Sequence, residues 1–165
     1  MRQNSEFQPL LTCIVPLYNT EKYIEQCIRS IYDQDIQVSD IEVIVIDDGS
    51  EDNSREIVSK LLKEFETLKL ISNNGNKKQG AARNTGLKNA LGKYIWFIDS
   101  DDYIKPNVLG ILLNSMQEYD LDLIHFDAEI IAYKDIITNR VRYSLDTCSG
   151  TDLIFDKNLK WSLKC

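Results

Sequence analysis

Four short apolar runs, separated by segments with helical spacing, constrain the fold more than any other feature of this sequence. The runs are residues 10–17 (LLTCIVPL), 41–46 (IEVIVI), 68–72 (LKLIS) and 93–98 (KYIWFI). They have the length of strands, and IEVIVI is too apolar for a strand with one face in water. Strands that alternate with helices predict an α/β fold, a mostly parallel sheet with helices on both faces.

The segments between the runs supply the helices, because their apolar residues recur every three to four positions. The first predicted helix covers residues 21–34, and the second begins after a cap at Ser50 or Asp52 and reaches Phe65. The third covers residues 81–91 and is ended by Gly92, and the fourth runs from Pro106 to Met116. Residues 121–133 alternate in part and predict a further strand. The 165 residues suit one domain, and they contain no repeat or linker.

Composition and charge exclude several classes of protein. The net charge is −7 and the pI is about 4.7, so general electrostatic binding to nucleic acid or to an anionic membrane is not expected. No apolar run approaches the ~20 residues of a membrane-spanning helix, and the polar first residues do not resemble a signal peptide. We therefore expect a cytoplasmic protein.

The cysteines indicate the redox environment. They stand at positions 13, 27, 148 and 165, without a CxxC pair or a cluster with His125, the single histidine. Cys13 lies in an apolar run and Cys27 on the apolar side of a predicted helix. We expect both to be buried free thiols in a reducing compartment, and zinc binding or thiol catalysis has no support.

Acidic clusters directly follow two of the predicted strands. Residues 47–50 (DDGS) come after IEVIVI, and residues 99–102 (DSDD) come after KYIWFI. In open parallel sheets, ligands lie outside the carboxyl ends of the strands. Asp99 and Asp101 are two residues apart, so in extended backbone they face the same side and can hold Mg²⁺ or Mn²⁺. The alternative for both clusters is helix capping in a solvated turn.

A basic segment lies between the two clusters. Lys77, Lys78 and Arg83 flank Gly80, at a predicted helix N-terminus that would favour an anion. Neither the GxGxxG nor the P-loop pattern occurs. A solvated loop is the favoured explanation for the two lysines. It is weaker for Arg83, which stands between small residues on a helix that faces the strand ends.

Three aromatic or histidine residues are further site candidates. Trp96 is expected to lie in the core, and His125 is expected to be a packed or surface residue. Tyr18 ends the first apolar run beside Asn19, where its ring can stack on a flat ligand.

Four motifs together resemble the family 2 glycosyltransferases, which have the nucleotide-sugar-binding GT-A fold. The motifs are residues 13–19 (CIVPLYN), 44–50 (IVIDDGS), 80–86 (GAARNTG) and 92–102 (GKYIWFIDSDD). The resemblance covers about residues 10–134, the expected donor-binding core of a single GT-A domain spanning residues 1–165.

The resemblance implies a role for each matching residue of a nucleotide site. Pro16 and Tyr18 would border the nucleobase, and Asp48 would hydrogen-bond it. Arg83 would lie near the nucleotide, and Asp99 would approach the ribose.

It also implies a metal and a reaction. Asp101 would hold Mn²⁺ or Mg²⁺ on the diphosphate, and the role of Asp102 is not assigned. The implied reaction is transfer of a sugar from a nucleoside-diphosphate donor, by default a UDP-sugar, to an acceptor hydroxyl with inversion, in polysaccharide or glycan synthesis.

The end of the sequence departs from the family. The family's catalytic base is an acidic residue, often in a Glu-Asp pair, well downstream of the DxD motif, which is Asp99-Ser100-Asp101 in this sequence. The acidic residues after position 134 are Asp135, Asp146, Asp152 and Asp156, none in such a pair. We expect the base to lie beyond Cys165 and the chain to be truncated, so that it binds donor and metal but transfers sugar poorly.

Three functional hypotheses remain from the sequence. The first is a glycosyltransferase acting on a glycan or lipid-linked acceptor, in the cytoplasm or at the cytosolic face of a membrane. The second is a module of the same fold that binds nucleotide-sugar without chemistry. The third, a receiver-type signalling domain, requires an acidic pair after the first strand, where this chain has Tyr18 and Asn19.

Overall fold

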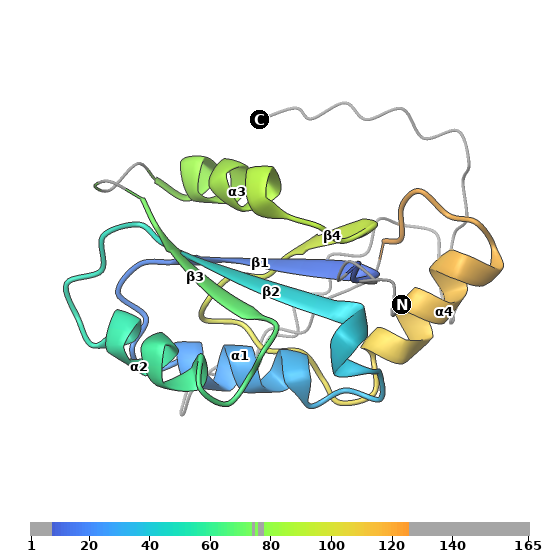
Figure 1. Cartoon of the computed structure of the whole chain (residues 1–165), viewed down its shortest axis with the longest axis horizontal. Helices are drawn as coiled ribbons and strands as arrows, with labels where there is room; N and C mark the ends of the chain where they lie inside the picture. The colour runs from blue at the N-terminus through green and yellow to red at the C-terminus, as the bar shows by residue number, and fades with distance from the viewer. Residues whose placement is uncertain (1–7, 74, 76–77, 126–165) are drawn as a thin grey trace, which may run out of the picture. The chain divides into compact units, whose positions relative to one another are not determined.

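The computed structural model describes residues 8–73, 75 and 78–125, in which strands and helices alternate as predicted (Figure 1). In chain order the elements are β1 (Leu11–Leu17), α1 (Ile24–Tyr32), the 3₁₀ turn η1 (Val38–Asp40), β2 (Ile41–Asp47), α2 (Ser54–Leu61), β3 (Leu68–Ser72), α3 (Lys78–Asn89), β4 (Tyr94–Phe97) and α4 (Leu109–Glu118). The chain divides into two compact units, Met1–Ile111 and Leu112–Cys165, and the sheet belongs to the first.

The four strands form one parallel sheet in the order β3-β2-β1-β4. The chain moves outward from β1 to β3 through α1 and α2, then returns across the sheet through α3 to β4. Figure 1 shows α1 and α2 on one face of the sheet and α3 on the other. The strand order thus reverses between β1 and β4, and open α/β sheets bind ligands at such a switch point.

The central strands form the core, as their composition predicts. All seven residues of β1 and all seven of β2 are buried, which parallel strands covered on both faces require. Pro16 is accommodated inside β1 because of its register. The Leu17 carbonyl accepts a hydrogen bond from the segment after β2, whereas the Ile14 carbonyl accepts one from Ile98 after β4. Pro16 therefore faces the β4 side, where the pairing has ended at Ile14 and no N–H is needed.

Small residues let α3 approach the sheet closely. Ala82 and Gly86, one helical turn apart, are the buried residues of this helix. A methyl group added to Gly86 would lie 2.3 Å from Cγ2 of Ile14, in the middle of β1. The absence of a side chain at this position sets the distance between α3 and β1.

A buried carboxylate, Glu42, joins residues near the amino-terminal ends of the strands. Glu42 is fully buried in β2, where it accepts hydrogen bonds from the Thr12 hydroxyl (2.7 Å), the Leu91 backbone N–H (2.9 Å) and the Lys69 ammonium. Burial by itself raises the pKa of Glu42, but these three donors outweigh it and hold the pKa below its usual 4.5. The segment that leads into β4 is further fixed by the Gly92 N–H, which donates to Thr12.

Two predictions near α3 and α4 were wrong. Gly92 does not end a helix, since α3 stops at Asn89. Its Cβ would lie 2.5 Å from the backbone nitrogen of Thr12, so close backbone approach is what requires glycine there. Residues 121–125 contain no strand, and residues 126–133 lie outside the described part.

The physical reason for the missing strand is the end of α4. Asp120 adopts a left-handed conformation (φ 49°), and the Leu121 N–H donates back to the Met116 carbonyl at 2.9 Å. This is the Schellman arrangement that closes a helix, so Leu121 is buried as part of a helix end. Elsewhere the boundaries shift by a few residues: α1 begins at Ile24 instead of 21, and α3 begins at Lys78 instead of 81.

The helices of the described part are short, and α3 with 12 residues is the longest of them. None of these described helices combines the length and the apolar character needed to cross a bilayer.

Candidate functional site

The end of β4 carries the first part of the candidate site. Arg83 of α3 reaches across to Asp99, and its Nη2 lies 2.7 Å from Oδ1 of the carboxylate. Gln79, one turn earlier on α3, donates to the same oxygen at 2.7 Å. The guanidinium also lies 5.7 Å from the centre of the Phe97 ring. The structure therefore brings together two residues that belong to separate sequence motifs.

Arg83 retains one buried N–H. Its Nε is buried, and no hydrogen-bond partner for it occurs among the described residues. Buried polar groups in proteins are normally paired, so this atom marks a place where an acceptor group from a ligand would fit.

The end of β2 carries the second part. Asp48 is 4% exposed, and its Oδ1 accepts a hydrogen bond of 2.9 Å from the side-chain amide of Asn73, just after β3. The Asn73 Oδ1 in turn lies 3.0 Å from the hydroxyl of Thr85 on α3. Gly49, which follows Asp48, has φ 90°, so the tight turn predicted for it is present and requires glycine.

The loops after β1 and β2 are tied together by reciprocal hydrogen bonds. Asn19 adopts a left-handed conformation (φ 52°), and its side chain accepts from the Glu51 N–H at 2.8 Å. Asp52 accepts from the Glu21 and Ser54 N–H groups just before α2. This network fixes the backbone around Tyr18. The predicted cap at Ser50 or Asp52 was wrong, because the N-cap of α2 is Asn53 and it makes no side-chain cap hydrogen bond.

The base-bordering residues predicted from the motifs differ in exposure. Tyr18 is 45% exposed at the end of β1, whereas Pro16 is buried inside the strand. The ring of Tyr18 is thus accessible at the carboxyl end of β1, while Pro16 is enclosed within the sheet, and their roles at a nucleobase stay predictions.

The DxD segment is anchored through its middle residue. Ser100 is 5% exposed and accepts a hydrogen bond of 3.0 Å from the Thr20 hydroxyl. Asp101 and Asp102, by contrast, are exposed. Burial, then the neighbouring carboxylates of Asp101 and Asp99, raise the pKa of Asp102 above its usual value. The segment therefore concentrates negative charge at the surface, which is the environment a divalent cation offsets.

The residues present fit a metal that is shared with a ligand. Among the described residues, no three His, Cys, Asp or Glu side chains converge to form a complete protein cage. Mg²⁺ in nucleotide sites is typically held by one or two carboxylates together with phosphate oxygens and water. Asp101, exposed beside Asp99 and Asp102, suits that partial coordination.

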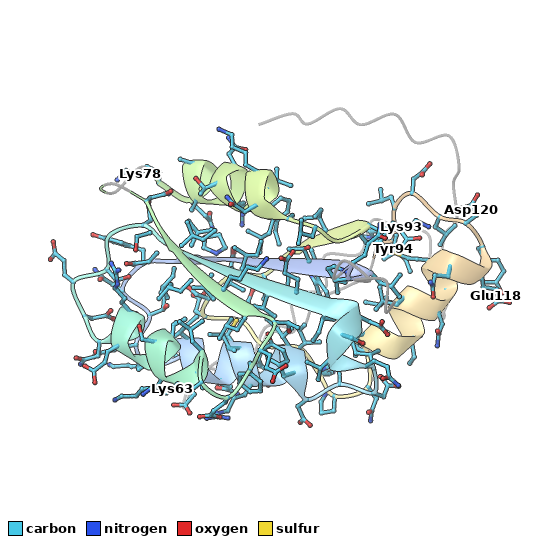
Figure 2. All side chains as sticks on the ribbon, in the orientation of Figure 1. Lys63, Lys78, Lys93, Tyr94, Glu118 and Asp120 are labelled. Atoms are coloured by element: carbon cyan, nitrogen blue, oxygen red, sulfur yellow. The ribbon has the colours of Figure 1, made fainter. Side chains whose placement is uncertain are left out.

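The remaining sequence candidates lie as follows. Lys78 is exposed at the N-terminal end of α3, where Figure 2 labels it, and its anion-binding role stays a prediction. Lys77 lies outside the described residues. Trp96 is half-buried in β4, so the core position predicted for it was wrong, and His125 is exposed at the edge of the described part.

Cys13 and Cys27 are buried free thiols, as predicted. Burial, followed by the nearby carboxylates of Asp102, Asp101 and Asp99, raises the pKa of Cys27 to about 12. Burial likewise raises the pKa of Cys13. Both thiols are therefore protonated and inert at neutral pH, and Cys27 serves as a weak donor to the Asp99 carbonyl at 3.6 Å.

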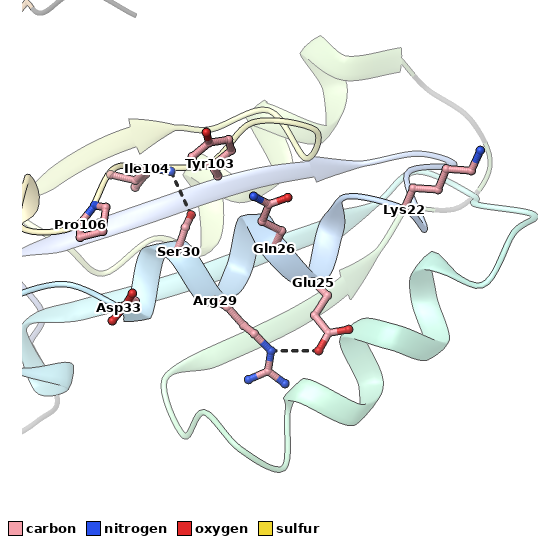
Figure 3. A pocket seen from close by; sticks show the side chains of 9 residues that line it. All are labelled: Lys22, Glu25, Gln26, Arg29, Ser30, Asp33, Tyr103, Ile104 and Pro106. Atoms are coloured by element: carbon pink, nitrogen blue, oxygen red, sulfur yellow. Dashed lines mark hydrogen bonds and ion pairs between the residues drawn. The ribbon is translucent and has the colours of Figure 1, made fainter. Parts of the chain in front are cut away.

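A shallow pocket lies away from these residues, between α1 and the segment before α4 (Figure 3). Its volume is about 610 Å³, and its walls include Arg29, Ser30 and Tyr103. Arg29 is paired with Glu25, and the Ser30 hydroxyl accepts the Ile104 N–H. None of the residues predicted for the nucleotide or the metal lines it.

Sequence reasoning misses four residues that make hydrogen bonds in the candidate site: Asn73, Gln79, Thr85 and Ser100. Asn73 follows a predicted strand directly, so the strand-end argument used for Asp48 could have selected it. Thr85 and Gln79 lie in or beside the matched GAARNTG motif, but nothing local distinguishes them. Ser100 is the variable middle residue of DxD, and only the tertiary contact with Thr20 shows its burial.

Comparison with solved structures defines the class of fold. S. aureus TarS (residues 1–349, in complex with UDP) superposes with a TM-score of 0.65 at 37% identity, over 68% of this chain and 33% of that one. A mannosyltransferase from Pyrobaculum calidifontis, in complex with GDP-Man and Mn²⁺, gives a TM-score of 0.60 at 28% identity, over 67% of this chain and 32% of that one. The described sheet is thus the α/β GT-A fold of nucleotide-sugar-dependent transferases.

The sequence family is equally clear. The family model of glycosyl transferase family 2 matches residues 12–158, and the chain belongs to this family. An uncharacterized glycosyltransferase of Haemophilus influenzae is 40% identical over 134 residues, which are 81% of this chain and 52% of that protein. The chain therefore spans about half the length of this relative and about a third of TarS residues 1–349.

Proposed function

We propose that this chain supplies the donor half of an inverting glycosyltransferase that uses a nucleoside-diphosphate sugar. The observation that carries the proposal is the cluster at the switch point: Asp99 held by Arg83 and followed by exposed Asp101, with buried Asp48 two strands away. Family membership and the UDP bound to TarS support it, since these residues lie within residues 12–158, which the family model matches.

The chemistry proposed for the site divides among the strand ends. Asp48 accepts a hydrogen bond from the nucleobase, Tyr18 stacks beside it, and Pro16 borders it. Arg83 orients Asp99 toward the ribose and offers its buried Nε to a nucleotide oxygen. The nucleotide is thereby positioned before transfer, which lowers the entropic part of the barrier.

Asp101 is proposed to hold Mn²⁺ or Mg²⁺ against the diphosphate. The cation would neutralise the charge that grows on the leaving diphosphate. An acceptor hydroxyl then attacks the anomeric carbon from the face opposite the diphosphate, which inverts the configuration. The carboxylate that takes the hydroxyl proton is not assigned among the described residues.

We further propose a UDP-sugar as the donor, because TarS, which is 37% identical over the aligned part, has been solved in complex with UDP and with UDP-GlcNAc. A glycan or lipid-linked acceptor, and a cytoplasmic location that includes the cytosolic face of a membrane, are proposed on the family alone. The competing proposal, a module that binds the donor without transfer, shares every residue named above and differs only in turnover.

The test measures thermal shifts with UDP in the presence of Mn²⁺ or in excess EDTA. UDP at 100 times its dissociation constant should add about 2.7 kcal/mol of stability, and only with the cation present. Asp101→Ala should abolish the cation dependence. Asp33→Ala, the same charge change on an exposed residue at the far end of α1, should preserve it. An equal shift in EDTA would refute the metal bridge, and no shift with any nucleoside diphosphate would refute the donor site.

A further inference from the structure

The amide of Asn73, just after β3, lies between a carboxylate that follows β2 and a hydroxyl on α3. Its Nδ2 is 2.9 Å from Oδ1 of Asp48 after β2, and its Oδ1 is 3.0 Å from the hydroxyl of Thr85 on α3. The Asn73 backbone N–H continues the β2–β3 pairing by donating to the Asp47 carbonyl at 2.8 Å. Both ends of the side chain and its backbone are therefore held.

The direction of each hydrogen bond follows from Asp48. A carboxylate only accepts, so the Asn73 amide must present its NH₂ group to Asp48 and its oxygen to Thr85. The Thr85 hydroxyl has one proton, which it can give either to Asn73 Oδ1 or to the Ala81 carbonyl, each 3.0 Å away. When the proton goes to Asn73 Oδ1, Thr85 holds the amide in the orientation that Asp48 requires.

The consequence concerns the nucleobase. A carboxylate held as an acceptor suits a base with a ring N–H, such as uracil or guanine. It opposes cytosine and adenine, which present a ring-nitrogen lone pair at the corresponding position. Sites built on a specific hydrogen bond discriminate strongly against analogues that leave a buried polar group unpaired.

We propose that Thr85 is a positioning residue that acts through Asn73 to hold Asp48 as the acceptor for a ring N–H of the nucleobase. This inference rests on the proposed nucleotide site, and it adds the class of base and the residues that select it. Thr85 itself does not touch the nucleotide in this scheme.

The experiment measures dissociation constants by calorimetry, with Mn²⁺ present, for UDP against CDP and for GDP against ADP. Thr85→Val keeps the shape of the side chain and removes the donor, and Thr85→Ser keeps the donor. Thr67→Val is the matched control, because the Thr67 hydroxyl also has a side-chain partner, the Tyr32 hydroxyl at 3.1 Å, away from the strand ends.

We expect the parent to prefer the ring N–H member of at least one pair. Thr85→Val should reduce that preference about ten-fold, the value of one oriented hydrogen bond. Thr85→Ser and Thr67→Val should leave the preference within about two-fold of the parent, because each keeps the donor to Asn73. A purely structural role would weaken both members of a pair equally, and this result would overturn the inference.

The two proposals fail in different ways. If the parent binds no nucleoside diphosphate, the donor site and the inference built on it both fall. If the parent prefers the ring N–H base, Asp48→Asn removes that preference and Thr85→Val does not, the donor site stands and the positioning role of Thr85 is wrong.

Discussion

Two glycines of α3 offer a sharp test of how the helix is seated on the sheet. Gly86 faces β1, where an added Cβ would lie 2.3 Å from Cγ2 of Ile14 and 3.1 Å from its Cγ1. Ile14 is fully buried in a central strand, so its branched side chain has little room to move. Gly80 lies in the first turn of the same helix, and a Cβ added there would meet nothing within 4 Å.

The magnitudes follow from these two environments. Gly→Ala in a helix gains about 0.5–1 kcal/mol, and Gly80→Ala should show up to that gain. Gly86→Ala has the same gain but forces an extra carbon into the core, which costs about 1–3 kcal/mol. The two variants should therefore differ by about 1–3 kcal/mol, or roughly 2–12 °C in melting temperature for a chain of this size.

The assay is urea unfolding followed by circular dichroism, with equal m-values as the condition for comparing free energies. Gly80→Ala should be as stable as the parent or more so, and Gly86→Ala should be less stable. If the two variants unfold at the same urea concentration, α3 does not rest on Ile14 as closely as the structure has it.

Two further outcomes depend on buried groups away from the strand ends. Because the pKa of Glu42 is lowered in the fold, the ionised side chain stabilises the folded state above about pH 4.5, and this stabilisation is lost as the pH falls through the folded pKa. Glu42→Gln should lower the free energy of unfolding by about 1–3 kcal/mol at pH 7 and reduce its loss in acid. Urea unfolding at pH 7 and at pH 4 would measure both effects. Retention of the full pH dependence in Glu42→Gln would assign it to other carboxylates. Cys13 and Cys27 should resist iodoacetamide at pH 8 in the folded chain and should react in urea. A thiol with a pKa of about 12, such as Cys27, is ionised in roughly one molecule in ten thousand at that pH. Rapid labelling of either cysteine in the native chain, detected by peptide mapping, would contradict their burial.

The positions of the strand-end residues could be predicted because they depend on local pattern. Asp48 and Asp99 each follow an apolar run, and a parallel sheet brings such positions to one edge. The direct ion pair between Asp99 and Arg83 could not be predicted, since it depends on how far α3 lies from the sheet. That distance is set by Gly86 against Ile14, two residues far apart in the printed sequence.

Gly92 and Leu121 show where local pattern misleads. A glycine just past a helix and an apolar residue in an alternating stretch each have two explanations that sequence alone does not separate. Gly92 is required by the backbone of Thr12, and Leu121 is used to close α4. In both cases a tertiary or helix-end contact decided between two locally acceptable structures.

The helix α3 connects the two halves of the candidate site, and its geometry explains how. Arg83 and Thr85 are two residues apart, so on an α-helix they point about 200° apart around the axis. Arg83 reaches Asp99 at the end of β4, and Thr85 reaches Asn73 after β3, the strand at the other edge of the sheet. A shift of α3 away from β1 would disturb both contacts together. Gly86→Ala should therefore weaken nucleotide binding as well as stability, although Gly86 touches neither contact.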